Sequence, residues 1–542
     1  MDTSEMIKEI IADNSKIIGA YAVLMLAFPL GEVVLPYYYG KVIERIPKDK
    51  PKNIFKNNKQ YFTIIIGLWV VNQVLRSAMD KLDAIFIPRL KSHVRKHMVL
   101  KTLKAYRGHY DDPEVGEMIA QLVKMPHVMR DLFYQLRYFI IPTTLVLIAA
   151  IGYLFFVDIN LGLIGLFGMV IFFALIYSFS KGCFTLSEDC DEYHNKLCEE
   201  CCDILSNMIN IFASGLEDEE LERFEKFQQE YNNKHSQTIG CAARFRTLFN
   251  TLYFALFAAV NGYGIYLYSQ KKISMSSLSS VLIVMIYAIN NLSGVSSEID
   301  DFISNVGVLQ KTQKTLNKMT EQELSSGTDI FDISSGHVIF HNVVVKKENF
   351  TLRFSGEFYP GEKVAIIGQV GSGKSTLIHS LMGYHTLESG KVTIDGKNVA
   401  NIDLNYLRKQ IAYVPQTPRL FNRTVLENIC YGSDIKKEDV ENALSSLNIT
   451  QINKDDLSRK AGKNGSHLSG GQKQIVYLLR LLLRSNIKIV ILDEPTASLD
   501  ENSRQQVLSL IEMLMLGKTT IIVTHDPSLM KLVNRKIILS KK

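Results

Sequence analysis

The chain has 542 residues and a formal net charge of +6, a length that suits about three or four domain-sized units. Hydrophobic residues make up 47% of the composition, but they are concentrated in roughly the first 300 positions. The uncharged runs in that part are too long for the core of an ordinary soluble protein, which excludes a wholly soluble chain.

Stretches of membrane-spanning length recur in this part. Four of them contain no charged residue, and each is near or above the roughly 20 residues that cross a bilayer as a helix. Two more are weaker, because one contains Glu32 and the other continues as an amphipathic helix past Arg76 and Asp80. The sequence predicts an all-α transmembrane domain over residues 1–318, with six spans at about 17–40, 60–80, 138–157, 159–180, 247–270 and 273–297.

Cysteines crowd into one short segment after the fourth predicted span. Five of the seven lie in residues 183–202, and Cys190, His194, Cys198 and Cys201 share one helical face. Soft ligands on a face can bind a thiophilic metal, but they spread over about 16 Å, so one ion cannot reach all four without a partner chain. We favour buried small residues at a helix–helix seam. Because the segment should lie in a reducing compartment, we expect no disulfide there.

A change of composition marks a second half. Residues 319–336 are rich in Ser, Thr, Glu and Asp, which is typical of a linker. In residues 337–542, Lys363 to Ile367 and Ile487 to Leu492 are short apolar runs bounded by turns, the pattern of buried parallel strands. The carboxyl ends of such strands are where α/β sheets bind ligands. We therefore predict an α/β domain.

A phosphate-binding loop follows the first of these strands. Residues 368–375 read Gly-Gln-Val-Gly-Ser-Gly-Lys-Ser, in which glycines before a helix aim backbone N–H groups at phosphates. The lysine and the serine would reach the phosphates and Mg²⁺. The sequence predicts nucleoside triphosphate binding by Gly368, Gly371, Ser372, Gly373, Lys374, Ser375 and Thr376.

Two later segments identify a family. Leu468-Ser469-Gly470-Gly471-Gln472 and then Asp493-Glu494 resemble the signature and the acidic pair of ATP-binding-cassette (ABC) proteins. Six spans followed by one cassette resemble the exporter-type half-transporters of that family, and the resemblance covers nearly the whole chain. It implies an all-α six-helix transmembrane domain followed by an α/β P-loop ATPase domain.

Phosphoryl transfer assigns roles to the acids. Asp493 closes an apolar strand, where a carboxylate would orient Mg²⁺ or its waters, and Glu494 is the natural general base for the attacking water. The resemblance adds Gln416, from the family's glutamine loop at the metal site, and His525, the switch histidine that contacts the γ-phosphate. We expect ATP and Mg²⁺ as cofactors, with Glu494, His525 and Lys374 catalytic and Ser375, Gln416 and Asp493 at the metal.

The signature implies a partner chain. Ser469, Gly470 and Gly471 offer an anion site at a helix N-terminus, yet Lys374 already serves the phosphates of its own chain. In the family, two cassettes pack head to tail, so that the signature, here Ser469 to Gln472, covers ATP held by the other chain, and the D-loop with Asp500 crosses over. No catalytic element is degenerate. We therefore favour a homodimer, with a heterodimer open.

The membrane half matches the family less closely. Residues 110–117 and 205–214 look like the two places where the family has coupling helices. The basic residues 81–107 suit a cytosolic loop, and although the first outer loop is also basic, we keep the cassette cytosolic because ATP is cytosolic. Lys347 stands where the family usually has an adenine-stacking aromatic, with Phe350 close by. Glu32 either reaches water at the outer interface or lines the translocation cavity.

These observations predict an ATP-driven membrane transporter that exports a small or amphipathic molecule, a lipid or a peptide. An importer with exporter architecture and an ATP-gated channel or regulator remain alternatives. The six spans exclude a soluble ABC ATPase of the translation or DNA-repair kind, and we expect no nucleic-acid partner. Which substrate is carried, and in which membrane, is not encoded in a recognisable motif.

Overall fold

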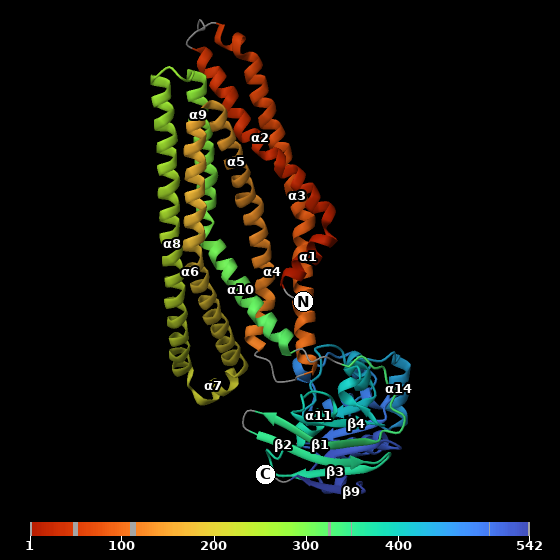
Figure 1. Ribbon diagram of the computed structural model, residues 1–542. Coiled ribbons are helices and arrows are strands. Elements are labelled where there is room, and N and C mark those ends of the chain that lie inside the picture. Colours follow the sequence, from red (N-terminus) through yellow and green to blue (C-terminus); the bar gives the residue numbers. More distant parts are fainter. Residues whose placement is uncertain are drawn as a thin grey trace. The chain divides into compact units, whose positions relative to one another are not determined.

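The computed structural model describes residues 3–46, 53–108, 115–322, 327–347, 350–497 and 499–539 (Figure 1). It divides into two compact units, Met1–Thr102 with Asp112–Thr320 and Leu103–Asp111 with Glu321–Lys542, and each is described by itself. The first is helical and the second is α/β, as the sequence predicts. Residues 323–326 of the predicted linker are not described, so its bounds stay a prediction.

Long helices build the first unit because apolar spans continue directly into amphipathic stretches. In the part of the chain that is described, five helices are long and apolar enough to cross a membrane. The first predicted span falls in α2, where the side chains of residues 27–33, Glu32 included, lie outside the description. Both that span and the role of Glu32 stay predictions. The helices up to residue 322 are α1 (Thr3–Asp13), α2 (Ser15–Arg45), α3 (Ile54–Gly108), α4 (Val115–Tyr134), the π-helix η3 (Gln135–Ile140), α5 (Ile141–Val157), α6 (Ile159–Ser206), α7 (Met208–Ser214), α8 (Glu217–Ser269), α9 (Met275–Ser297) and α10 (Ile299–Gln322), the last of which extends into the predicted linker.

Of the two predicted coupling segments, the structure describes the second. Residues 109–114 and the side chains of 115–117 are not described, so the first segment cannot be placed. The second contains α7, a short helix at the turn between α6 and α8 (Figure 1). Gly215 ends α7 with a left-handed backbone, φ 66°, which glycine adopts without steric cost.

Helices α6 and α8 pack side by side with opposite chain directions, and the cysteine-rich face follows their seam. The Sγ of Cys190 lies 3.7 Å from Nδ1 of His235 on α8, and the His194 ring meets the Tyr231 ring edge-on at 5.8 Å. No group of three or more His, Cys, Asp or Glu side chains among the described residues is arranged to hold a metal ion.

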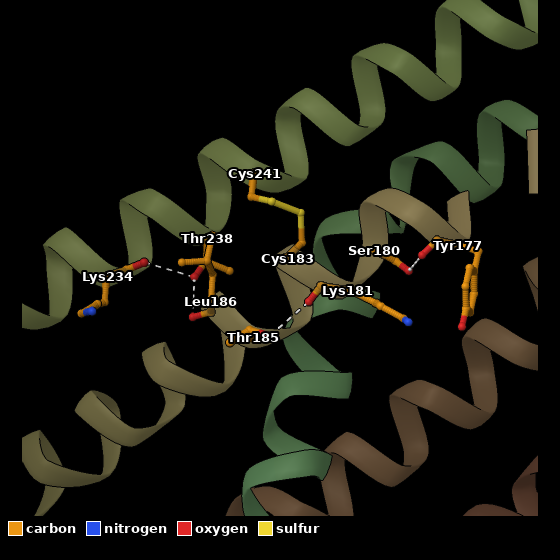
Figure 2. Close-up of a disulfide and its surroundings, with 9 residues drawn as sticks. All are labelled: Tyr177, Ser180, Lys181, Cys183, Thr185, Leu186, Lys234, Thr238 and Cys241. Carbon is orange, nitrogen blue, oxygen red and sulfur yellow. Dashed lines mark hydrogen bonds between the residues drawn. A yellow bond between two sulfur atoms is a disulfide. The ribbon is translucent and has the colours of Figure 1, made fainter. Parts of the chain in front are cut away.

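The expectation of no disulfide in this segment is wrong for Cys183. Cys183 on α6 is bonded to Cys241 on α8, with Cα atoms 5.6 Å apart (Figure 2). Their separation of 58 residues gave no hint of this contact, which arises from the packing of the two helices. Cys183 is fully buried in an apolar cluster and Cys241 is partly buried against it, which restricts the access of an attacking thiolate and slows reduction.

Thiol labelling tests the disulfide directly. When the full chain is denatured without reductant and alkylated, we expect Cys183 and Cys241 to stay unmodified and to be recovered by mass spectrometry as one cross-linked peptide pair. Cys430, a free cysteine of the other unit, should be alkylated in the same sample and serves as the control. Alkylation of both Cys183 and Cys241 before reduction would contradict the assignment.

Two sheets form the second unit. One has five parallel strands in the order β6-β7-β8-β3-β9, and the other has four antiparallel strands in the order β2-β1-β4-β5. The middle strand β8 is buried at all five positions, which explains why its sequence does not alternate between buried and exposed residue types. The strands are β1 (Val338–Lys347), β2 (Phe350–Phe358), β3 (Lys363–Gly368), β4 (Ser389–Ile394), β5 (Lys397–Asn398), β6 (Ile411–Val414), β7 (Ile489–Asp493), β8 (Thr519–Val523) and β9 (Arg535–Leu539).

Helices surround these sheets and begin with well-formed caps. Thr424 and Glu427 form a reciprocal capping box at the start of α13, and Asp403 caps α12 by accepting from the Tyr406 amide. The α-helices are α11 (Lys374–Leu381), α12 (Leu404–Lys409), α13 (Val425–Ile429), α14 (Lys437–Ser446), α15 (Gly470–Leu482), α16 (Glu501–Met515) and α17 (Pro527–Met530), and the 3₁₀ turns are η4 (Val399–Asn401), η5 (Asp455–Ser458) and η6 (Lys463–Gly465).

Candidate functional site

One edge of the parallel sheet collects most of the predicted site residues. Strands β6, β7, β8 and β3 are neighbours and run in the same direction, so their carboxyl ends meet at this edge. The phosphate loop follows β3, the acidic pair follows β7, and Gln416 and His525 follow β6 and β8. Residues up to 157 positions apart in sequence, Gly368 and His525, are thereby brought to one edge.

The phosphate loop depends on two glycines with left-handed backbones. Gly371 has φ 79° and Gly373 has φ 92°, conformations that other residues rarely adopt. A Cβ at Gly371 would meet nothing within 4 Å, so the loop is open on that side. A Cβ at Gly373 would lie 2.5 Å from the Phe350 ring, which therefore packs against the loop. The loop thus has space for a ligand on one side and aromatic support on the other.

Lys374 and Ser375, the first residues of α11, extend the loop's polar surface. Lys374 Nζ donates to the carbonyl oxygens of Gly368, at 2.7 Å, and Gln369, at 3.0 Å. These bonds fold the ammonium group over the loop. Ser372 has a buried hydroxyl oxygen with no hydrogen-bond partner among the described residues. The side chain of Lys347 is not described, and Phe350 serves the loop as a packing residue.

The acidic pair lies directly beside the loop. Ser375 Oγ donates to Asp493 Oδ2 at 3.4 Å, and Gln416 Nε2 donates to Glu494 Oε2 at 2.9 Å. The Glu494 backbone has φ 46°, uncommon for a residue other than glycine, and its N–H donates to the Val523 carbonyl at 2.8 Å. This turn separates the two carboxylates, so that Asp493 contacts Ser375 and Glu494 contacts Gln416.

The electrostatics of the pair suit a hard cation. Burial, and then repulsion from the Glu494 carboxylate, raise the pKa of Asp493 above its ordinary value. A cation beside the two carboxylates would relieve this repulsion. The Ser375 hydroxyl and the Asp493 carboxylate provide oxygen ligands, which Mg²⁺ prefers. The residues present therefore fit a Mg²⁺ site.

The signature segment begins α15 and lies apart from these contacts. Ser469 Oγ accepts from the Gln472 amide at 3.2 Å, and Gln472 Oε1 accepts from the Ser469 amide at 3.1 Å, a complete capping box. A Cβ at Gly471 would lie 2.3 Å from Ser503 Oγ, so close packing with α16 requires glycine. Asp500 caps α16 at Ser503. Within the described residues, Ser469 and Gln472 form no hydrogen bond with the phosphate loop.

The loop after β8 is held by a residue that the sequence did not indicate. His525 is exposed, whereas Asp526 accepts from Arg504 Nη2 at 2.6 Å and Nε at 3.1 Å and from Thr496 Oγ1 at 2.7 Å. Thr496 lies two residues after Glu494. Asp526 therefore ties the loop that carries His525 to the turn that carries the general-base candidate.

Gln474 is a second residue that sequence reasoning missed. It is 2% exposed and donates through Nε2 to the Pro495 carbonyl at 2.8 Å, which connects the signature helix to the turn after Glu494. A buried glutamine inside an amphipathic helix pattern is the only signal that could have revealed it. A buried polar side chain among the apolar positions of α15 indicates that it has a specific hydrogen-bond partner.

Comparisons with known proteins agree with this arrangement. The family model described as ABC transporter transmembrane region matches residues 18–292, and the model described as ABC transporter matches residues 352–497. The mouse (Mus musculus) ABC-type oligopeptide transporter ABCB9 is 25% identical, over 96% of this chain and 69% of its own length. The ATP-dependent lipid A-core flippase of Albidiferax ferrireducens is 29% identical, over 85% and 81%. A solved bacterial Atm1-family ABC exporter with ATP bound has a similar fold, with a TM-score of 0.83 and 20% identity over 97% of this chain and 94% of that one.

The bonds to Asp526 predict a pH-dependent stability. Burial opposes its ionisation, but hydrogen bonds from Arg504 and Thr496 outweigh burial and lower its pKa to about 2. A lowered pKa stabilises the fold above the unfolded-state pKa, and this contribution disappears as the pH falls through about 2. We expect Asp526→Asn to lower stability by roughly 2 kcal/mol at pH 7, with the difference shrinking below about pH 4.

Thermal unfolding of the full chain in nanodiscs, followed at several pH values, measures this difference. The matched control is Glu501→Gln, because Glu501 is an exposed second partner of Arg504 and its pair should contribute little. Equal effects of the two substitutions, or a pH-independent loss in Asp526→Asn, would contradict the prediction.

Proposed function

Because the chain belongs to the ABC transporter family and joins an exporter-type transmembrane region to one ATP-hydrolysing cassette, we propose that it exports an amphipathic cargo by alternating access. The chain is a multi-pass integral membrane protein. ATP-driven export is general to its relatives, and the alternating-access mechanism and the cargo are our proposal. The observation that carries it is the pairing of Asp493 with Ser375 and of Glu494 with Gln416 beside an open phosphate loop.

The phosphate loop would hold ATP. Backbone N–H groups from Gly371 to Thr376, at the start of α11, would face the β- and γ-phosphates, and Lys374 would release its carbonyl partners to neutralise them. Ser375, Gln416 and Asp493 would hold Mg²⁺. Bound Mg²⁺ supplies charge neutralisation on the phosphate oxygens. Gly368 would allow the loop to pack closely, since a Cβ there would lie 2.5 Å from the Leu539 carbonyl oxygen and 2.6 Å from Ser372 Oγ.

Glu494 would act as the general base. Its carboxylate accepts from the Gln416 side chain and would take a proton from a water in line with the γ-phosphate. This hydrogen bond connects Glu494 to the glutamine loop, to which Gln416 belongs. His525 would contact the γ-phosphate from the neighbouring strand β8, in a loop position fixed by Asp526.

A second chain would complete each site. Membership in a half-transporter family implies dimerisation, and among the described residues no hydrogen bond joins the signature, Ser469 to Gln472, to the phosphate loop of the same chain. We propose a homodimer with two competent sites, in which each signature and each Asp500 segment serve the partner's ATP. Ser498 of that segment lies outside the described residues.

The cargo is proposed from the relatives alone. One is named for oligopeptides and another for lipid A-core, so we propose an amphipathic lipid or peptide as the cargo. An importer and an ATP-gated channel on the same frame are the alternatives. Proteoliposome assays with ATP on the cassette side distinguish the three functions. An exporter moves cargo away from the cassette side, and an importer moves cargo toward it. A channel conducts ionic current, and ATP only opens or closes it.

Glu494→Gln tests the mechanism. The amide cannot accept a proton, so we expect ATP binding near the wild-type level, hydrolysis reduced by about a hundredfold or more and no transport in proteoliposomes. Glu512→Gln, an acid on the far end of α16, should leave turnover unchanged. Hydrolysis near the wild-type rate in Glu494→Gln would remove its assignment as general base. Ionic current that persists in that variant with bound ATP would favour the channel.

Mixed dimers test the shared site. Lys374→Ala and Ser469→Arg should each abolish turnover as homodimers, because each damages both composite sites. A dimer with one chain of each kind has both defects in one site and a second site intact, so we expect it to bind ATP at one site and to regain part of the hydrolysis. Differently tagged chains allow its purification. No difference between the mixed dimer and the two homodimers would contradict head-to-tail pairing.

A further inference from the structure

A cavity of about 230 Å³ lies within the helical unit. Helices η3, α5, α6, α8 and α9 and the start of α10 enclose it, near the ends of the predicted spans. Its lining is mainly apolar, half aliphatic and half aromatic among the apolar residues, as in pockets that bind small organic molecules. Seven phenylalanines contribute, Phe139, Phe172, Phe173, Phe184, Phe245, Phe249 and Phe302.

Five polar side chains also line this cavity, and the hydroxyls among them already donate to the main chain. Thr143 donates to the Asn291 carbonyl at 3.4 Å, Thr144 to Ile140 at 2.8 Å and Ser180 to Tyr177 at 3.3 Å, the last of which Figure 2 shows. The two remaining side chains are Gln135 and Glu298. Both present oxygen acceptors, so the cavity has spare acceptors and no spare hydroxyl donor.

Gln135 has an unsatisfied acceptor. The residue is 4% exposed, and its Oε1 is buried with no hydrogen-bond partner among the described residues. It begins the π-helix η3, an irregularity that is rare in helices and frequent at functional sites. A buried carbonyl oxygen without a donor is costly, and a ligand N–H group would satisfy it.

Glu298 sets the charge of the cavity. It lies at the junction of α9 and α10 and is the single ionisable side chain in the lining. Among the cations that lie close in sequence to lining residues, Arg246 pairs with Asp300 at 2.9 Å, Arg137 pairs with Asp83 at 2.5 Å, and the Lys181 ammonium lies 4.6 Å from the centre of the Tyr177 ring. No ion pair to Glu298 is present within the described ranges. The cavity therefore favours a positive charge, and aromatic faces add to that preference.

A second cavity of about 330 Å³ lies next to the first and shares Leu147, Phe172 and Leu292 with it. Its lining is aliphatic and aromatic, and it extends along α5, α6 and α8 into the predicted spans. We propose that the two cavities together bind an amphipathic amine. Its protonated nitrogen donates to Gln135 Oε1 and the Glu298 carboxylate, and its alkyl or aromatic part occupies the phenylalanine lining and the second cavity. This site does not depend on the cassette roles proposed above.

Photolabelling of the full chain in nanodiscs tests the proposal. The probe is an alkylamine with a diazirine in its chain, and adducts are mapped by mass spectrometry. We expect saturable labelling of α5, α6 and α8 around the two cavities, displaced by dodecylamine and not by dodecanoate. Displacement by dodecanol as strong as by dodecylamine would show that Glu298 contributes nothing, and labelling confined to other helices would overturn the site.

Substitutions locate the polar contacts. Glu298→Gln should raise the dodecylamine concentration needed for displacement by about tenfold, and Gln135→Leu, which keeps side-chain bulk, by several-fold. Asp301→Asn, an exposed acid three residues along α10, is the matched control and should change nothing. Glu298→Asp keeps the charge and should retain most of the affinity. An unchanged concentration in Glu298→Gln would overturn the proposal, whatever its effect on ATP hydrolysis.

Discussion

The parallel pairing of β3, β8 and β7 is the constraint from which the nucleotide site follows. Because side-by-side parallel strands end at the same edge, Gly368, Val523 and Asp493 lie together, and every polar loop that follows them meets there. The bond from the Glu494 amide to the Val523 carbonyl extends this pairing one residue beyond β7. The left-handed backbone at Glu494 is then possible because Asp493 and the Glu494 amide are both held by pairing with Val523.

Sequence reasoning reached the residues of this edge because each belongs to a motif with a fixed chemical role. Glycines, a lysine and a serine before a helix, and two acids after a strand, need no tertiary information to be recognised. Asp526, Arg504 and Gln474 have no such pattern, since their function is to hold loops that come together only in the fold. The sequence gives their identity but not their partners, and single polar residues in helices and turns are too common to single out.

Sequence reasoning reached fewer of the important residues in the helical unit. Its spans could be predicted from hydropathy, yet the contacts between them could not, because apolar helices pack against one another without distinguishing residues. The disulfide shows the consequence. Its cysteines lie on helices separated by the α7 turn, and only the antiparallel packing of α6 and α8 places them together. The compartment argument is sound for exposed thiols and applies less to this pair, in which Cys183 is fully buried and Cys241 partly buried.

The same seam also shapes the aromatic cavity. Phe184 follows Cys183 on α6, and Phe245 and Phe249 lie one and two turns beyond Cys241 on α8, so the disulfide joins the two helices at the base of the cavity's phenylalanine wall. A cross-link there limits the relative movement of these helices. Because the lining is then ordered before the ligand arrives, binding loses less conformational entropy. The disulfide, which the cassette chemistry does not require, thus lies next to lining residues of the cavity on both helices.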